Sequence, residues 1–282
     1  MQMQLRLDEQ QTEQYLIMQS IEEDCNIDIN EKLDYPPVAL SLGETLIKGK
    51  NKDMLLPIPI GTYGNFSFVQ APPKTKKTFF ISLLASVYLS DKNHFGGNIK
   101  GHRYGKQLIH IDTEQGKWHC QRVFKRVVEM AGTSDDYLTY GLRTINYKER
   151  IDFIDYCLEH KTDNAGLLIV DGIADLCADV NNIEESNACV QKLMEWSAKH
   201  NVHIMCVIHS NFGTDKPTGH LGSFLEKKAE TQIQLEANTV NKEWITVKCR
   251  RSRGYAFETF SFKVNDIGLP EIVGDLYDPL QN

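Results

Sequence analysis

The fold is decided by the segment Val69-Gln70-Ala71-Pro72-Pro73-Lys74-Thr75-Lys76-Lys77-Thr78, which precedes the apolar run Phe79-Phe80-Ile81-Ser82-Leu83-Leu84. Its ending, Lys77-Thr78, matches the end of the phosphate-binding pattern G-x-x-x-x-G-K-[ST], which lies between a strand and a helix. In such a loop, backbone amides and the helix N-terminus hold phosphates, the lysine contacts the terminal phosphates and the hydroxyl contacts Mg²⁺. Both glycines are missing here, because Ala71 and Lys76 occupy their positions. Taken alone, the segment is better explained as a chance resemblance in a basic loop, so the rest of the chain must decide.

Length and composition are compatible with a soluble protein of one elaborated α/β domain or two small domains, and we favour one. The chain has 282 residues with 41% hydrophobic content, which fits one elaborated domain. Its net charge is 31 − 38 = −7, so any binding of nucleic acid must be local. Seven scattered cysteines without a C-x-x-C pair favour a reducing cytoplasm over a disulfide framework or a zinc site. Because there is no signal-peptide pattern and no run of 18 apolar residues, we expect a cytoplasmic protein without a membrane contact.

The order of predicted elements indicates a doubly wound, mostly parallel sheet. Strands are expected at residues 66–70, 107–112, 137–144, 166–170 and 202–209, and helices at 78–90, 117–130, 149–160 and 184–200. Strands that alternate with helices pair in parallel through right-handed crossovers. Beyond Glu230, β-rich runs at 231–235, 243–248 and 258–264 predict a C-terminal β-meander that closes the sheet.

The N-terminal part of the chain has a different character. Residues 8–24 are polar with an apolar stripe, which predicts an exposed helix. We therefore divide the chain into an N-terminal helical arm, residues 1–34, with a possible oligomer contact, and a core at 35–282. The Pro- and Gly-rich stretch 35–64 is predicted to be an irregular lead-in with edge strands.

Polar side chains follow three of the predicted core strands. Asp171 ends the apolar strand at 167–170, Asp112-Thr113-Glu114 ends another, and His209-Ser210 ends a third. Because the carboxyl ends of parallel strands meet at one edge of a sheet, we expect these residues beside the loop at 71–78. Asp171 can hold the water shell of Mg²⁺, and Glu114 can accept a proton from a water that attacks the γ-phosphate.

With these motifs in order, the chain resembles the RecA-like ATPases, specifically the branch of hexameric replicative helicases of the RepA and DnaB kind and related proteins of plasmids and mobile elements. The resemblance spans about 36–274. It implies a RecA-like fold, catalysis by Glu114 and Lys77, a γ-phosphate sensor at His209, and Mg²⁺ held by Thr78 and Asp171. The residues that it places around ATP are Pro73, Lys74, Thr75, Lys76, Lys77, Thr78 and Asp171.

Two further motifs extend the resemblance to DNA and to assembly. Lys248-Cys249-Arg250 resembles the K-x-R hairpin that reaches the nucleotide of a neighbouring subunit, which implies catalytic roles for Lys248 and Arg250. Residues 219–230 resemble the segment after the family's mobile DNA-binding loop. The resemblance and the local charge together name these residues as DNA-binding: Lys216, Gly219, His220, Arg251 and Arg253.

Each of these residues also has an ordinary structural interpretation. The lysines of the loop can form a solvated turn, Glu114 can complement a helix N-terminus, and His209 can be a satisfied core residue. Pro72-Pro73 removes two amide donors, and Lys76 puts a side chain where the backbone must approach phosphate. The basic residues at 248–253 can be exposed hairpin charges, although alternation places Lys248 and Arg250 on one face.

Three functions are compatible with these patterns. The leading hypothesis is a homo-oligomeric ATPase, a hexamer or filament, that uses ATP and Mg²⁺ to act on single-stranded DNA, with loops 173–187 and 211–222 facing a central channel. It would serve replication or transfer of a mobile element, with replication or mobilisation proteins as partners. The second is an adaptor or regulator that binds nucleotide or partner proteins without turnover. The third, a small-molecule kinase, lacks a candidate arginine-rich lid.

Overall fold

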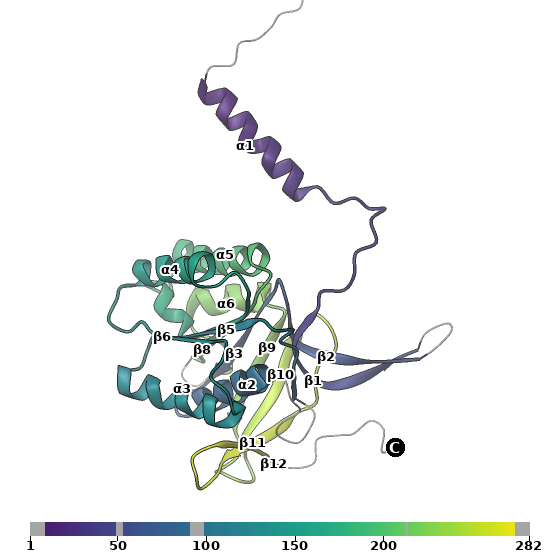
Figure 1. The fold of residues 1–282 in the computed structure, drawn as a ribbon. Coiled ribbons are helices and arrows are strands. Elements are labelled where there is room, and N and C mark those ends of the chain that lie inside the picture. Colours follow the sequence, from purple (N-terminus) through teal and green to yellow (C-terminus); the bar gives the residue numbers. More distant parts are fainter. Residues whose placement is uncertain (1–8, 49–52, 91–98, 212–213, 274–282) are drawn as a thin grey trace, which may run out of the picture. The chain divides into compact units, whose positions relative to one another are not determined.

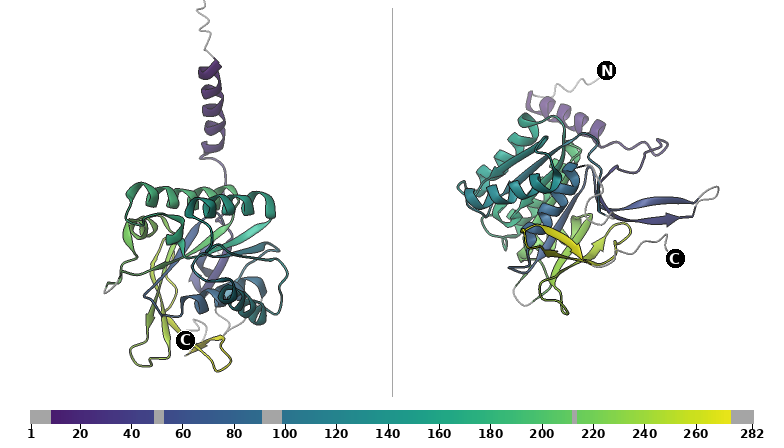
Figure 2. Two further views of the ribbon diagram at one scale, coloured as in Figure 1. Left: turned by 90° about the vertical axis from the view of Figure 1, so that its left-hand side faces the viewer. Right: turned by 60° about the horizontal axis from the view of Figure 1, so that its bottom comes forward.

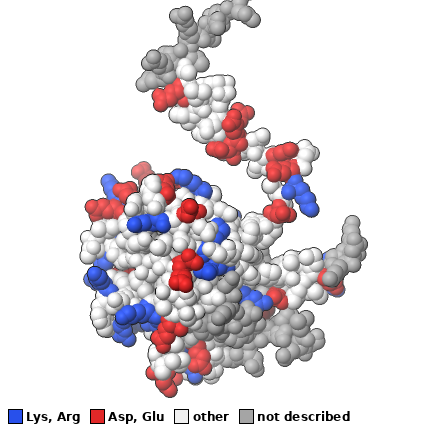
Figure 3. All heavy atoms as spheres, viewed as in Figure 1, with Lys and Arg blue, Asp and Glu red and all other residues white. Residues whose placement is uncertain are grey.

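The structure is a computed structural model that describes residues 9–48, 53–90, 99–211 and 214–273. The chain divides into two compact units, Met1–Tyr35 and Pro36–Asn282. The first unit contains helix α1 (Glu9–Cys25), which covers the helix predicted at 8–24. The large apolar side chains Tyr15, Leu16 and Ile21 on this helix are exposed. Acidic side chains are spread along this unit (Figure 3).

A nine-stranded sheet forms the centre of the second unit (Figure 1). Its parallel strands are β3 (Phe66–Ala71), β5 (Gln107–Asp112), β6 (Tyr137–Gly141), β7 (Ala165–Asp171), β8 (His203–His209) and β9 (Thr231–Ala237). They lie side by side in the order β9-β3-β8-β7-β5-β6. Strand β7 is buried on both faces, as its uninterrupted apolar run predicts. The doubly wound, mostly parallel sheet is therefore confirmed.

Helices cover both faces of this sheet and create two cores. Helices α2 (Lys77–Ser90) and α3 (Lys117–Ala131) lie on one face (Figure 1). Helices α4 (Tyr147–Tyr156), α5 (Ile183–Lys199) and α6 (Gly219–Lys228) lie on the other. Helix α2 is apolar on nearly every side, because it packs between the sheet, α3 and further strands. Trp196 of α5 is fully buried in the opposite core.

Antiparallel strands complete the sheet at its C-terminal end. Strand β10 (Ile245–Ser252) pairs with β9, β11 (Phe260–Val264) pairs with β10, and β12 (Pro270–Val273) pairs with β11. The predicted β-meander is confirmed, and β12 is an additional strand. A register shift between Cys249 and Arg251 interrupts the pairing of β10 with β9, which alters the alternation that the sequence predicts around Arg250.

The prediction for residues 35–64 is confirmed for an edge strand but is wrong in expecting an irregular segment. Strands β1 (Val38–Ile47), β2 (Met54–Thr62) and β4 (Ile99–Gly101) form a separate antiparallel sheet in the order β2-β1-β4. Pro57 and Pro59 are tolerated because β2 is an edge strand. The outer part of the β1–β2 hairpin projects from the rest of the unit (Figure 2).

Four local predictions also need correction. The strand expected at 137–144 ends at Gly141, because Asn146 caps α4 through a capping box with Glu149. The helix expected at 149–160 begins at Tyr147 and continues as a π-helical turn at Cys157–Lys161. The loop expected at 173–187 contains a 3₁₀ turn at Ile173–Leu176 and the start of α5. The loop expected at 211–222 includes the first turn of α6, and its residues 212 and 213 lie outside the described residues.

Candidate nucleotide-binding site

The loop between β3 and α2 has the backbone of a glycine-containing turn without its glycines. Strand β3 ends at Ala71 and α2 begins at Lys77. Between them, Lys74 and Lys76 have φ values of 67° and 57°, in the left-handed region that favours glycine. The carbonyl of Lys76 accepts hydrogen bonds from the amides of Phe79 and Phe80 at 3.0 and 3.2 Å, which starts the helix. The positive φ at Lys76 supports the alignment of this position with the second glycine of the pattern.

The three predicted strand ends lie beside this loop. The register aligns Asp112 of β5 with Asp171 of β7, and Ala71 of β3 with His209 of β8. Lys77 Nζ donates a hydrogen bond to Nδ1 of His209 at 3.0 Å. His209 Nε2 lies 3.5 Å from Oε1 of Glu114. Lys77, His209 and Glu114 therefore form a continuous chain across the strand ends.

These contacts shift the pKa values of Glu114 and Lys77. The hydrogen bond from His209 lowers the pKa of Glu114, although burial partly opposes the shift, so Glu114 is ionised at neutral pH. Burial lowers the pKa of Lys77, and the carboxylates of Glu114 and Asp171 partly restore it. An ionised carboxylate at the edge of a cavity can orient a bound water and accept a proton from it.

Asp171 has the properties of a cation ligand. Its side chain is buried, and its Oδ2 atom has no hydrogen-bond partner among the described residues. Burial raises its pKa to about 7, together with the nearby carboxylates of Asp112 and Glu114, while Lys77 and Thr78 oppose the rise. An unpartnered buried carboxylate oxygen beside a threonine hydroxyl fits the hard oxygen ligands that Mg²⁺ prefers. The residues present at this position therefore fit the magnesium ion that the sequence predicts.

Two residues next to these carboxylates shape the site. Asp112 accepts hydrogen bonds from the amides of Glu114 and Gln115 at 3.0 and 2.7 Å, which holds the turn after β5. Gly172 follows Asp171 with φ 106°. A Cβ atom there would lie 2.2 Å from Oγ1 of Thr113 and 2.9 Å from Cγ of Glu114, so only glycine leaves room for this turn.

A cavity of about 280 Å³ lies between the loop and the strand ends. Sequence reasoning named six of its lining residues: Lys74, Lys76, Lys77, Thr78, Glu114 and Asp171. It did not assign ligand-contacting roles to the other five, which are Phe79, Asp112, Gln115, Val123 and Arg126. Phe79 and Asp112 are adjacent to the motifs. Val123 and Arg126 reach the cavity only through the packing of α3 against α2, which no motif predicts. Pro73 and Thr75 do not line it, and the Thr75 hydroxyl instead donates to the carbonyl of Pro72 at 2.6 Å.

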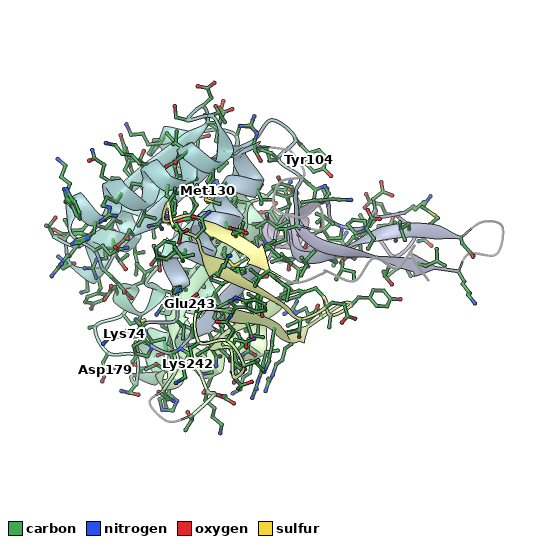
Figure 4. All side chains as sticks on the ribbon, turned by 90° about the horizontal axis from the view of Figure 1, so that it is seen from below. Lys74, Tyr104, Met130, Asp179, Lys242 and Glu243 are labelled. Atoms are coloured by element: carbon green, nitrogen blue, oxygen red, sulfur yellow. The ribbon has the colours of Figure 1, made fainter. Side chains whose placement is uncertain are left out.

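Lys76 also connects the loop to the turn between β9 and β10. Its Nζ donates a hydrogen bond to the carbonyl of Glu243 at 3.1 Å. Figure 4 shows Lys74 from the loop on the same side of the molecule as Lys242 and Glu243 from this turn. The side chain of Lys76 therefore has a protein partner, while its backbone occupies the glycine position.

The residues of the K-x-R motif lie outside this cavity. Lys248 on β10 forms an ion pair with Glu236 on β9, and Arg250 lies 4.0 Å from Asp215. Both side chains are close to half exposed, at 45% and 44%. They do not line the nucleotide cavity of their own chain.

Three of the residues predicted to bind DNA line a second cavity, of about 310 Å³. These are Lys216, Gly219 and His220, and they share the cavity with Asn181 and Ser223. Arg251 is exposed on β10, and Arg253 donates a hydrogen bond to the carbonyl of Lys228 at 2.6 Å. The two arginines are therefore separate from this second cavity.

The second cavity is connected to the nucleotide site through His209. The carbonyl of His209 accepts hydrogen bonds from the amide and hydroxyl of Thr218 at 3.0 and 2.8 Å. The imidazole of the same residue contacts Lys77 and Glu114. A displacement of His209 would therefore change contacts at both sites.

These features together form a RecA-like fold: a mostly parallel sheet, a loop with the backbone of a phosphate-binding turn, and acidic and polar strand ends beside it. Sequence comparison agrees, since the family model described as AAA domain matches residues 56–215. The chain belongs to this AAA domain family. Among the described residues, no helix is long and apolar enough to cross a membrane.

Comparison of structures supports the same fold. The crystal structure of the RadB recombinase superposes with a TM-score of 0.52 at 17% sequence identity, covering 75% of this chain and 92% of RadB. At this identity the likeness concerns the fold alone. No curated protein matches the chain in sequence.

Proposed function

We propose that the chain binds ATP with Mg²⁺ in the cavity beside the β3–α2 loop and hydrolyses it. The observation that carries this proposal is the chain of contacts Lys77–His209–Glu114, which lies beside the unpartnered Oδ2 of Asp171. It combines a cation for the terminal phosphates, a base for water and a ligand for a divalent ion at the ends of adjacent parallel strands.

Each residue has a defined role in this proposal. Lys77 binds the terminal phosphates, and Thr78 and Asp171 would hold Mg²⁺, which neutralises phosphate charge when bound. Glu114 orients the attacking water and accepts its proton. His209, between Lys77 and Glu114, responds to the presence of the γ-phosphate and transmits its own displacement to Thr218.

We further propose that the active form is a homo-oligomer, a hexamer or filament, that acts on single-stranded DNA. Its support is that Lys248 and Arg250 lie outside the cavity of their own chain and remain partly exposed. An arginine placed in this way can complete a site only on a neighbouring copy. The name of the RadB recombinase and the exposed basic residues Lys216 and Arg251 support DNA as the partner.

The order of the motifs favours the RepA and DnaB branch of helicase-like ATPases, with a role in replication or transfer of a mobile element and with replication or mobilisation proteins as partners. The division into an arm at 1–34 and a core at 35–282 fits this proposal, with the arm as a contact between subunits. The cytoplasm, where DNA and ATP are both present, is the proposed location.

A second function is an adaptor that binds nucleotide without turnover. The observation that favours it is the loop itself, because Pro72 and Pro73 lack amide donors and Lys76 is held by Glu243. A phosphate cradle with fewer donors stabilises a transition state less than a glycine-rich loop does. In this function, ATP binding would switch a partner contact through His209.

Turnover of ATP, measured with and without single-stranded DNA, tests the first function against the second. We expect Mg²⁺-dependent hydrolysis that DNA stimulates, and a decrease of roughly 10²- to 10⁴-fold in Glu114→Gln with nucleotide binding retained. The matched control is Glu129→Gln, an exposed carboxylate on α3. If the wild-type protein binds ATP but does not hydrolyse it, the adaptor function would be established.

A further inference from the structure

Arg126 lies at the wall of the nucleotide cavity and has no assigned role. It belongs to α3, but its guanidinium is held by α2: its Cζ atom lies 3.8 Å from the centre of the Phe79 ring, and Nη1 donates to Oγ of Ser82 at 3.2 Å. Phe79 directly follows the Lys77-Thr78 pair. The orientation of Arg126 is therefore fixed by the same helix whose N-terminus faces the cavity.

The charge of Arg126 is not neutralised by the protein. Other arginines form ion pairs, such as Arg103 with Asp136 and Arg150 with Asp175, but no carboxylate within the described ranges pairs with Arg126. Burial and the neighbouring Arg122 lower its pKa, which shows that the site disfavours a lone positive charge. A half-buried cation without a counter-ion beside a cavity favours an anion in that cavity.

The remaining donors of the guanidinium are available for such an anion. Arginine carries five N–H groups in a planar fork, and only one nitrogen of Arg126 is used by Ser82. Phe79 stacks against the guanidinium without consuming a donor. Lys74, Lys76 and Lys77 of the loop line the same cavity as Arg126 of α3.

We propose that Arg126 is a phosphate-binding residue of this site, supplied by the same chain, that contacts the polyphosphate of a bound nucleoside triphosphate. Its charge-assisted donors to the phosphates compensate for the amide donors that Pro72 and Pro73 do not supply. This role rests on the nucleotide binding proposed above and extends it to a residue that no loop motif contains. It differs from the roles of Lys248 and Arg250, which require a neighbouring copy.

A purely structural role predicts a different outcome. If Arg126 only joined α3 to α2 through Phe79 and Ser82, its replacement would lower the melting temperature. It would also weaken the binding of all nucleotides equally. A phosphate contact predicts a loss that grows with the number of phosphates. Arg126→Met keeps an unbranched side chain over Phe79 and removes the charge, and Arg126→Lys keeps the charge.

Arg122→Met is the matched control. Arg122 is also on α3, also lies over an aromatic ring, with Cζ 5.0 Å from the centre of the Trp118 ring, and does not line the nucleotide cavity. The full chain with each substitution is titrated calorimetrically with ATP, ADP and AMP in the presence of Mg²⁺, alongside wild type and Lys77→Ala. Melting temperatures are recorded without nucleotide.

We expect Arg126→Met to bind ATP roughly 10- to 100-fold more weakly, the range of a lost charge-assisted hydrogen bond. The affinity for ADP should decrease less, and the affinity for AMP least. Arg126→Lys should recover part of the affinity for ATP. Arg122→Met should bind all three nucleotides as the wild-type protein does. Wild-type affinity in Arg126→Met, or equal losses for all three nucleotides, would overturn the role of Arg126 while leaving the proposed function intact. No binding by the wild-type protein would overturn both.

Discussion

Lys76 carries a conformational cost that its alignment with a glycine explains. A left-handed backbone costs an L-residue about 1–2 kcal/mol, and the cost is highest for β-branched side chains. Because Lys76 has a φ of 57°, the free energy of unfolding should be higher for Lys76→Gly than for Lys76→Val, by about 1–2 kcal/mol. Both substitutions lose the contact with Glu243, so their difference isolates the backbone. Urea denaturation measures it, and equal stabilities would show that the loop is not left-handed at this position.

His110 gives the stability of the protein a pH dependence. It is fully buried beside Phe124, donates or accepts a hydrogen bond with the Tyr137 hydroxyl at 2.8 Å, and has its pKa lowered by burial to about 3. The unfolded chain therefore binds a proton between about pH 6.5 and pH 3 that the folded chain does not. The stability that this group contributes is present above pH 6.5 and is lost as the pH falls.

The expected loss is about 1.4 kcal/mol per pH unit below pH 6.5 for one such group. Urea unfolding between pH 7 and pH 5 measures it, and His110→Gln should reduce the slope, whereas replacement of the exposed His119 should not. An unchanged slope in His110→Gln would contradict the burial of a neutral histidine at this position.

Gly222 shows how an element of the fold depends on one side chain being absent. It lies in the first turns of α6, where a Cβ atom would come within 2.6 Å of the backbone carbon of Pro217. Gly222→Ala must displace α6 from the preceding loop, and we expect a loss of about 1–3 kcal/mol in unfolding free energy. Gly254, around which a Cβ atom would meet nothing within 4 Å, is the control. Equal effects at the two positions would contradict the packing of α6.

The elements that sequence predicted are those with strong patterns. Strand β7 was predicted from its apolar run, and α2 from the apolar residues after Lys77-Thr78. Helix α6 was not predicted, because Gly219, Gly222 and Ser223 are poor helix formers and its stability comes from packing. The prolines of β2 predicted an edge strand, which is correct, but they gave no indication of the separate sheet that β2 forms with β1 and β4.

The same reasoning explains which site residues could be found. Asp112, Asp171 and His209 follow predicted parallel strands, and the topology alone brings such strand ends together. Gln115 and Arg126 reach the cavity through a turn geometry and a helix contact that no spacing in the sequence encodes. Their contributions depend on tertiary packing, which a linear pattern does not contain.

The chain consists of two compact units, and we predict that they are separable. Met1–Tyr35 and Pro36–Asn282 are each compact, and the arm exposes Leu16, Ile17 and Met18. Deletion of residues 1–34 should leave the melting temperature of the core unchanged and should weaken assembly in the presence of ATP and DNA, because exposed apolar surface favours association. Light scattering of both chains measures the assembly. A destabilised core would show that the arm belongs to its fold.

Assembly in turn predicts complementation between defective chains. Lys77→Ala lacks the phosphate contact of its own site, and Arg250→Ala lacks the residue proposed to act on a neighbour. A mixture of the two should regain hydrolysis at interfaces that join an intact loop to an intact Arg250. Steady-state ATP turnover of the mixture measures it, and activity no greater than that of the separate variants would argue against a shared site.

The proposed function requires the cavity between the β3–α2 loop and Asp171 to bind a nucleoside triphosphate with Mg²⁺. Isothermal titration of the full chain with MgATP tests it most directly, with Lys77→Ala as the comparison. We expect wild-type protein to bind one ATP per chain and Lys77→Ala to bind at least roughly 10-fold more weakly, because a charge-assisted contact to the terminal phosphates is lost. Equal affinities of the two proteins, or no binding by the wild type, would contradict the account.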